Sequence, residues 1–223
     1  GGKLTSKGAN NLIDVVQLAG KEWLLYKSFP IDIAFIRGTS ADENGNISVE
    51  DEAVINEVVA IALATHNSRG KVIVQVKKLV KNGEISAKSV LIPGHLVDAI
   101  VVAEDVENDH RQCVAYVHNP ALSGQVKAQA GPLGFPLASG YRKIIAARAI
   151  QELQPGYNVN LGQGIPTDMV PLIDPKKCPV NFSLESGVSG GVPHPVPDFG
   201  VATNPESMMR QDDQFKFYDG GGL

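Results

Sequence analysis

Before residue 104, apolar residues gather in short runs that predict strands, interrupted by one stretch with helical spacing. Residues 31–37 are mostly apolar, which is typical of a strand covered on both faces. Residues 50–65 place apolar side chains three and four positions apart, after an acidic first turn that suits the positive end of a helix dipole. The other strand candidates are residues 12–18 and 22–27, as a hairpin, and residues 71–79, 88–92 and 96–103. This order of strands and helix favours an α/β fold with a mostly parallel sheet.

The pattern changes between residues 104 and 139, where charged residues, prolines and glycines predict a linker between two domains. A second unit begins near residue 140. Residues 141–153 predict a helix with one apolar face, and residues 157–161 predict a strand. The predicted domains are therefore residues 1–103 and 140–223, joined by the linker.

A predicted buried strand, residues 180–184, leads directly into Glu185. Three glycines follow at once, at Gly187, Gly190 and Gly191. Ligands of open α/β sheets bind at the carboxyl ends of strands, and glycines let a ligand approach the backbone N–H groups. Glu185 is therefore a candidate nucleophile or acid/base catalyst. From the spacing alone, a solvated loop glutamate beside a flexible turn is the alternative.

A second glycine turn, Gly162–Gln163–Gly164, lies between the predicted strand 157–161 and a helical segment at 167–173. A strand, a Gly-x-Gly turn and a helix N-terminus together form the layout of an anion or phosphate site. The turn lacks the third glycine of the dinucleotide fingerprint, and the lysine of a P-loop is absent as well. Close packing of the strand against the helix is the alternative explanation of the same glycines, and the sequence slightly favours it.

Other polar residues in the predicted loops match no convincing site. Asp42 and Glu43 can be interpreted as a metal or acid pair, but residues in such turns are more often solvated turn formers. His110, Cys113 and His118 have gaps of three and five residues, which do not match a zinc pattern. We therefore expect no metal.

Composition narrows the class of protein. The 223 residues carry a net charge of −4, which argues against a general nucleic-acid or anionic-membrane surface. The two cysteines are far apart and fit a reducing compartment. No apolar run is long enough to span a bilayer. The chain opens on Gly1–Gly2–Lys3 and stops at a run of glycines, so it is expected to be an internal fragment of a longer protein.

Several motifs that are weak one by one occur together in this chain. The second half holds Asn160–Pro166, Glu185–Ser186–Gly187 with Gly190–Gly191, Asp198–Phe199–Gly200 and Asp219–Leu223, and the first half holds Leu25–Ser48 and Gly70–Lys78. As a set they resemble the family I coenzyme A transferases. The resemblance is greatest to the single-chain acetate or propionate type, which acts on an acyl-CoA and a carboxylate.

The resemblance implies a fold of two similar layered α/β halves with mostly parallel sheets, each incomplete here. It also implies that Glu185 is the nucleophile of a double displacement that passes through a glutamyl-CoA thioester. Backbone groups that could bind CoA or an oxyanion are expected at Gly162, Gly164, Gly187, Gly190, Gly191 and Gly221. Coenzyme A is expected as a substrate, with no further cofactor.

The expected partners are an acyl-CoA and a short carboxylic acid, in a homo-oligomer located in the cytoplasm or, in a eukaryote, in the mitochondrial matrix. This chain alone is expected to be inactive. One alternative is an isomerase of the sugar-phosphate isomerase group, with Glu185 as a base and Gly162–Gly164 holding phosphate. The other alternative is a non-catalytic domain that has kept the fold.

Overall fold

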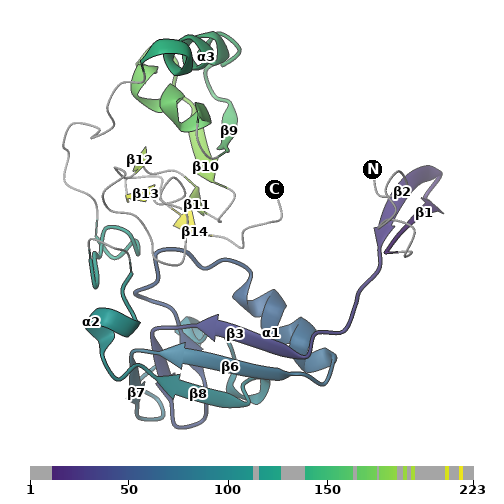
Figure 1. Cartoon of the computed structure of the whole chain (residues 1–223), viewed down its shortest axis with the longest axis vertical. Helices are drawn as coiled ribbons and strands as arrows, with labels where there is room; N and C mark the ends of the chain where they lie inside the picture. The colour runs from purple at the N-terminus through teal and green to yellow at the C-terminus, as the bar shows by residue number, and fades with distance from the viewer. Residues whose placement is uncertain are drawn as a thin grey trace.

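The computed structural model describes residues 12–112, 116–126, 139–162, 165–174 and 176–184, with the short strands 188–189, 192–193, 209–210 and 216–217. An N-terminal hairpin stands apart from a layered unit that contains β3, β6 and β8 (Figure 1). A second unit, which contains α3, β9 and β10, lies at the opposite end of the view.

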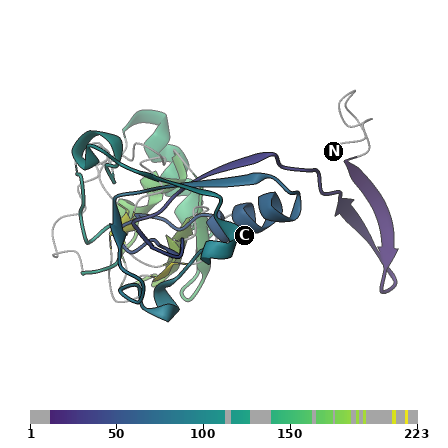
Figure 2. The same cartoon turned by 90° about the horizontal axis from the view of Figure 1, so that it is seen from below.

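The hairpin consists of β1 (Ile13–Leu18) and β2 (Lys21–Tyr26), paired antiparallel with Leu18 opposite Lys21. Ala19 and Gly20 form its two-residue turn, and both have positive φ (50° and 75°), as the favoured hairpin turns require. The predicted hairpin is therefore confirmed. It projects away from the layered unit (Figure 2), and its large apolar side chains are exposed, for example Trp23 at 54%.

The first sheet is parallel and has the strand order β3–β6–β8, from β3 (Ile33–Arg37), β6 (Lys71–Val76) and β8 (Ala99–Val102). Helix α1 (Val58–Asn67) packs on one face of it. The core of that face is Ala34, Ile36, Ala41, Ile47, Ala62, Val72, Val74, Val76, Ile92 and Leu96. The other face is open at β3 in the part of the chain that is described, since Phe35 is 79% exposed. The prediction that this strand is covered on both faces is not met there.

A small mixed sheet, with the order β5–β4–β7, extends from the ends of β3 and β6. Its strands are β4 (Ser40–Asp42), β5 (Ile47–Ser48) and β7 (Lys78–Val80), followed by two short 3₁₀ helices, η3 (Ala87–Ser89) and η4 (Gly94–Leu96). The predicted strand 88–92 is wrong, because η3 and a single bridge from Ile92 to Ile47 occupy this stretch.

Helix α2 (Val106–Asp109) begins in the predicted linker, and the Asp105 side chain caps it by accepting from the backbone N–H groups of Glu107 and Asn108. Residues 116–126 follow as turns, and the buried Leu122 packs with Ala53. Much of residues 104–126 therefore packs on the first unit. The domain boundaries proposed from the sequence remain a prediction.

The second unit contains α3 (Gly140–Ile150), β9 (Asn158–Leu161), the 3₁₀ helix η5 (Ile165–Leu172) and β10 (Asn181–Leu184). Strands β9 and β10 are parallel, in a sheet of order β14–β11–β10–β9. The remaining strands are β11 (Val188–Ser189), β12 (Val192–Pro193), β13 (Met209–Arg210) and β14 (Lys216–Phe217). The predicted α/β class with parallel sheets is confirmed. None of the described helices combines the length and the apolar character that crossing a membrane requires.

Candidate functional site

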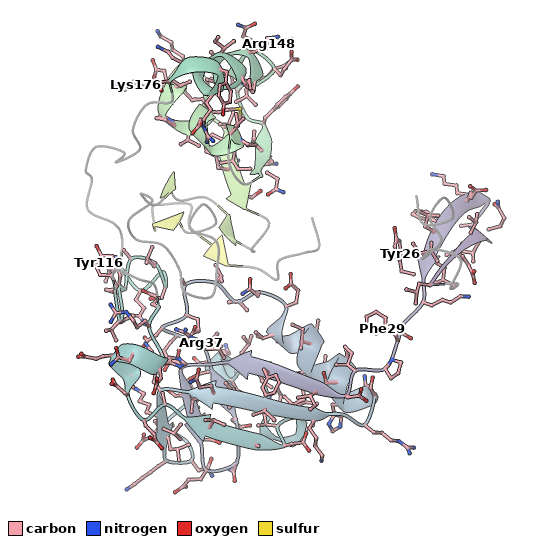
Figure 3. The ribbon with its side chains drawn as sticks, viewed as in Figure 1. Tyr26, Phe29, Arg37, Tyr116, Arg148 and Lys176 are labelled. Carbon is pink, nitrogen blue, oxygen red and sulfur yellow. The ribbon has the colours of Figure 1, made fainter. Side chains whose placement is uncertain are left out.

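Charged side chains gather at the carboxyl ends of β3 and β6. Arg37 ends β3 (Figure 3). Its Nε atom lies 2.8 Å from Glu52 Oε2. This Nε atom is buried and makes no hydrogen bond, so the contact is an attraction between charges and not a directed bond. The other oxygen of the same carboxylate, Glu52 Oε1, lies 3.3 Å from Nε2 of His110, whose side chain is fully buried.

Asp51 is the centre of a second set of contacts beside this one. It pairs with Lys77 Nζ at 3.0 Å, accepts a hydrogen bond from Gln125 Nε2 at 2.8 Å, and lies 3.4 Å from His118 Nε2. Burial acts on the carboxyl most strongly and would raise its pKa. The hydrogen bonds from Gln125 and Lys77, with the nearby positive charges, outweigh it and lower the pKa of Asp51.

These contacts change the interpretation of the acidic run Glu50–Glu52. The sequence predicts that it begins a helix, but α1 begins only at Val58. The three acids instead hold the segment 104–126 on the strand ends, because Gln125 also donates to the carbonyl of Glu50 and Gln112 to that of Asp51. The prediction of a helix from residue 50 is therefore wrong at its start.

The other predicted acid, Asp42, also has a structural role. It is 4% exposed and accepts hydrogen bonds from the backbone N–H groups of Asn44 and Asn46 and from Asn46 Nδ2, each at 2.9 Å. The side-chain bond from Asn46 contributes most to lowering the pKa of Asp42. Within the described residues, no three His, Cys, Asp or Glu side chains form a metal-ligand set.

The second region of interest is the carboxyl end of the β9–β10 pair. Leu161 lies opposite Leu184 in the parallel register, so both strands end at the same edge of the sheet. Gly162 directly follows Leu161, and Glu185 directly follows Leu184 in the sequence. Gly162 is exposed. The other predicted site residues lie outside the described residues: Glu185, Gly164, Gly187, Gly190, Gly191 and Gly221.

The two strands present one polar and one apolar face, as alternation along a strand requires. Asn181 Nδ2 donates to Asn158 Oδ1 at 3.1 Å, and Ser183 Oγ donates to Asn160 Oδ1 at 3.3 Å. On the apolar face, Leu161 is buried in a cluster that includes residues of α3 and η5. The strand ends that precede the two glycine motifs are therefore supported from one side and polar on the other.

The predicted anion site at the start of η5 gains limited support. Pro166 has no backbone N–H to offer, and Asp168 adds a negative charge to the first turn. Arg142 Nε from α3 donates to Asp168 Oδ2 at 2.7 Å, so the carboxylate is partly neutralised. A Cβ at position 162 would meet only Pro166 Cγ, at 3.7 Å, so close packing does not require glycine there.

A cavity of about 210 Å³ lies beside β3, between this strand, the loop before α1 and the first turn of α1. Its polar lining comes from Arg37, Glu52, Asn56 and Gln112, and the rest is apolar. Sequence reasoning did not single out these residues. The available signal was an arginine that ends an apolar strand, at the sheet edge where ligands bind.

Comparison with known proteins extends this description. Residues 2–103 match the family model described as Coenzyme A transferase. Over the whole length of the present chain, a caffeate CoA-transferase from Acetobacterium woodii is 40% identical to it. Over the same length, the acetate CoA-transferase YdiF from Escherichia coli K12 is 37% identical. The alignments cover 43% and 42% of those two proteins, so the chain spans less than half the length of these curated relatives.

Two solved structures of the acyl-CoA transferase YdiF from Escherichia coli O157:H7 also match. The apoenzyme superimposes with a TM-score of 0.70 and 33% identity, over 90% of this chain and 36% of that one. The form described as a thioester complex with CoA gives 0.69 and 30%, over 93% of this chain and 38% of that one. The resemblance to coenzyme A transferases inferred from the motifs is confirmed, and the similarity extends along the whole chain.

Proposed function

We propose that the protein carrying this chain transfers coenzyme A from an acyl-CoA to a carboxylic acid, with Glu185 as the nucleophile. The observation that carries the proposal is the similarity along the whole chain to CoA-transferases. One of the matching structures is described as a thioester complex with CoA, and the match covers 93% of this chain.

The reaction divides one difficult exchange into steps between activated acyl groups. The Glu185 carboxylate attacks the carbonyl of the acyl-CoA and expels the CoA thiolate, leaving a mixed acyl-glutamyl anhydride. The thiolate then attacks the glutamyl carbonyl, which forms the glutamyl-CoA thioester and releases the first acid as its carboxylate. A second carboxylate then attacks the glutamyl-CoA thioester, and the same steps run in reverse. The second acid leaves as the new acyl-CoA, and the Glu185 carboxylate is restored.

The local structure suits this chemistry. β9 and β10 end together, immediately before Gly162 and Glu185 in the sequence. Each tetrahedral intermediate carries an oxyanion, which needs N–H donors already aimed at it, and removing one donor typically costs roughly a hundred- to a thousand-fold in rate. Backbone N–H groups of Gly187, Gly190 and Gly191 are our candidates for these donors.

Further parts of the proposal follow from the family and not from the geometry. Coenzyme A serves as a substrate and no other cofactor takes part. Acetate and propionate are the first acids to test, and the active form is a homo-oligomer. A cytoplasmic location is the simplest one for an enzyme that uses acyl-CoA.

Intact-mass analysis tests the proposal directly. The full-length protein that carries this sequence is incubated with acetyl-CoA, and one half of the sample is then treated with borohydride. We expect an adduct of the mass of CoA, lost on reduction because borohydride cleaves the thioester. Glu185→Gln and Glu185→Ala should give no adduct, whereas Glu84→Gln, at an exposed glutamate of the first unit, should give the normal one.

If no adduct forms while CoA still binds, the transferase proposal fails. Proton exchange on a sugar phosphate would then be assayed, since an isomerase would use Glu185 as a base. An adduct that persists in Glu185→Gln would leave CoA transfer standing but would remove Glu185 as the nucleophile.

A further inference from the structure

The cavity beside β3 is suited to part of the substrate, and this inference rests on the proposed CoA transfer. We propose that it binds the carbon tail of the carboxylic acid and so sets which acids the enzyme accepts. The acids it favours are monocarboxylic acids with a medium-length or aromatic apolar tail.

The position of the cavity supports this role. It lies where β3 ends, at the carboxyl edge of a parallel sheet, where α/β folds bind ligands. Val54 lines it and is also part of the apolar cluster that contains Leu161, at the end of β9. Leu161 pairs with Leu184, the residue before Glu185. The cavity and the end of β9 therefore share one apolar cluster, and β9 pairs with the strand that Glu185 follows in the sequence.

The lining selects for an apolar tail. Three parts of the first unit, namely β3, the loop before α1 and α1 itself, supply apolar surface from Phe35, Val54, Ile55, Val58 and Ile61. Such a surface binds hydrocarbon by removing it from water, at about 25 cal/mol per Å² of buried apolar area. It offers nothing to a charged group, whose burial without a partner costs free energy.

The charged lining disfavours a second carboxylate. Arg37 is the cation of the lining, and Glu52 lies 2.8 Å from its Nε atom and already neutralises it. The neighbouring Glu50 and Asp51 add two negative charges to this end of the sheet, against the one positive charge of Lys77. A dicarboxylic acid would therefore place its far carboxylate against like charges, which is unfavourable.

The volume sets an upper size for the tail. An apolar cavity of about 150 Å³ holds a benzene molecule. The cavity here measures about 210 Å³, enough for one ring with a short arm or an alkyl chain of similar bulk. Acetate would leave most of this space unfilled.

The test varies the cavity at Ile61, which lines it and is 38% exposed on α1. Ile61→Trp reduces the space and Ile61→Ala enlarges it. Leu63→Trp is the matched control, because Leu63 lies on the same helix with 42% exposure but, two positions on, faces another direction. Initial rates are measured on the full-length protein with propionyl-CoA as donor and acetate, hexanoate, benzoate or succinate as acceptor.

The measured quantity is kcat/KM for hexanoate or benzoate divided by that for acetate. Because one methylene in an apolar pocket changes kcat/KM by roughly 10- to 200-fold, Ile61→Trp should lower this ratio by about tenfold or more. Leu63→Trp should leave the ratio within about twofold of the wild type, and succinate should be a poor acceptor throughout. Ile61→Ala should keep or raise the ratio for the larger acids.

The outcomes separate this inference from the function on which it rests. If the wild type transfers no CoA to any acid, the proposed function and the inference fall together. If acetate is accepted normally and the ratio does not change in Ile61→Trp, or changes equally in Leu63→Trp, the inference fails and the transferase proposal stands. A preference of the wild type for succinate over hexanoate would also overturn the inference.

Discussion

The two units of the chain end their parallel strands in different ways. At the ends of β3 and β6, Glu50, Asp51 and Glu52 contact Ser40 of β4, Lys77 directly after β6, and residues His110 and Gln125. At the ends of β9 and β10, the described residues are an exposed glycine, Gly162, and a polar face of asparagine and serine. The charges are dense in the first unit, whereas the proposed nucleophile, Glu185, directly follows a strand of the second unit in the sequence.

This difference shows what a carboxylate needs in order to react. Asp51 interacts with a lysine, a glutamine and a histidine, and its pKa is lowered, so its charge is stabilised in place. A nucleophile must instead keep a lone pair free for the substrate carbonyl. The cluster of acids at the strand ends of the first unit therefore holds neighbouring segments in place. The single acid that stands beside glycines in the sequence is the better candidate for a catalytic residue.

The largest expected effect is the loss of activity at the proposed nucleophile. Glu185→Gln keeps the size of the side chain but removes the attacking carboxylate. We expect kcat for CoA transfer to fall by about 10⁴-fold, as is common when a covalent nucleophile is removed. The double variant Asp51→Asn, Glu52→Gln should retain much more activity at a temperature where it remains folded. If this double variant is the more damaged enzyme, the contrast between the two units is wrong.

The next effect is on stability in the first unit. Lys77 is 10% exposed and pairs with the half-buried Asp51, so Lys77→Met leaves a carboxylate with fewer partners. We expect a loss of about 2 kcal/mol, measured as a Tm lower by about 5 °C. Lys71→Met is the control, because Lys71 is 67% exposed and its pair with Asp98 should matter far less. Equal shifts for the two variants would contradict the account of the cluster.

A smaller effect concerns pH. The pKa of Asp42 is lowered in the folded state, first by the hydrogen bond from Asn46, so this group stabilises the fold above its unfolded pKa of about 3.9. That stabilisation is lost as the pH falls through the folded pKa. Urea unfolding at pH 7 and pH 3 should show a smaller acid-induced loss in Asp42→Asn than in the wild type. An unchanged loss would mean that Asp42 does not carry this linkage, and Glu84→Gln serves as the control.

The smallest effect is expected in the second unit. Asp168 joins η5 to Arg142 of α3, and its side chain is 16% exposed. Asp168→Asn should lower the free energy of unfolding by about 1 kcal/mol. Glu152→Gln, which breaks an exposed pair with Arg148 on α3, should have almost no effect. If Asp168→Asn also raises KM for acyl-CoA by tenfold or more, the start of η5 contributes to binding as well as to stability.

Local patterns predicted much of the fold. The hairpin, β3, β6, α3, β9 and β10 all follow from apolar runs with clear breaks at glycine or proline. The family resemblance implied mostly parallel sheets, and β9 and β10 are indeed parallel. The glycine motifs and Glu185 could be found from the sequence because they directly follow strands.

What could not be predicted depends on contacts between distant residues. The helical pattern of residues 50–65 is real, but the side chains of Asp51 and Glu52 bind Lys77 and His110, and this keeps the first part of the stretch out of the helix. The predicted linker stays a prediction, but composition did not indicate that Gln112 and Gln125 within it bind Asp51 of the first unit. The cavity beside β3 needs three elements together, and no local pattern encodes it.

The most direct test of the central claim is to locate the thioester. The full-length protein is incubated with acyl-CoA, reduced with borohydride, digested and analysed by tandem mass spectrometry, which identifies the glutamate that has become an alcohol. The account predicts one modified residue, Glu185. A modification at Glu50, Glu52 or another carboxylate, or CoA transfer with no reduced residue, would contradict it.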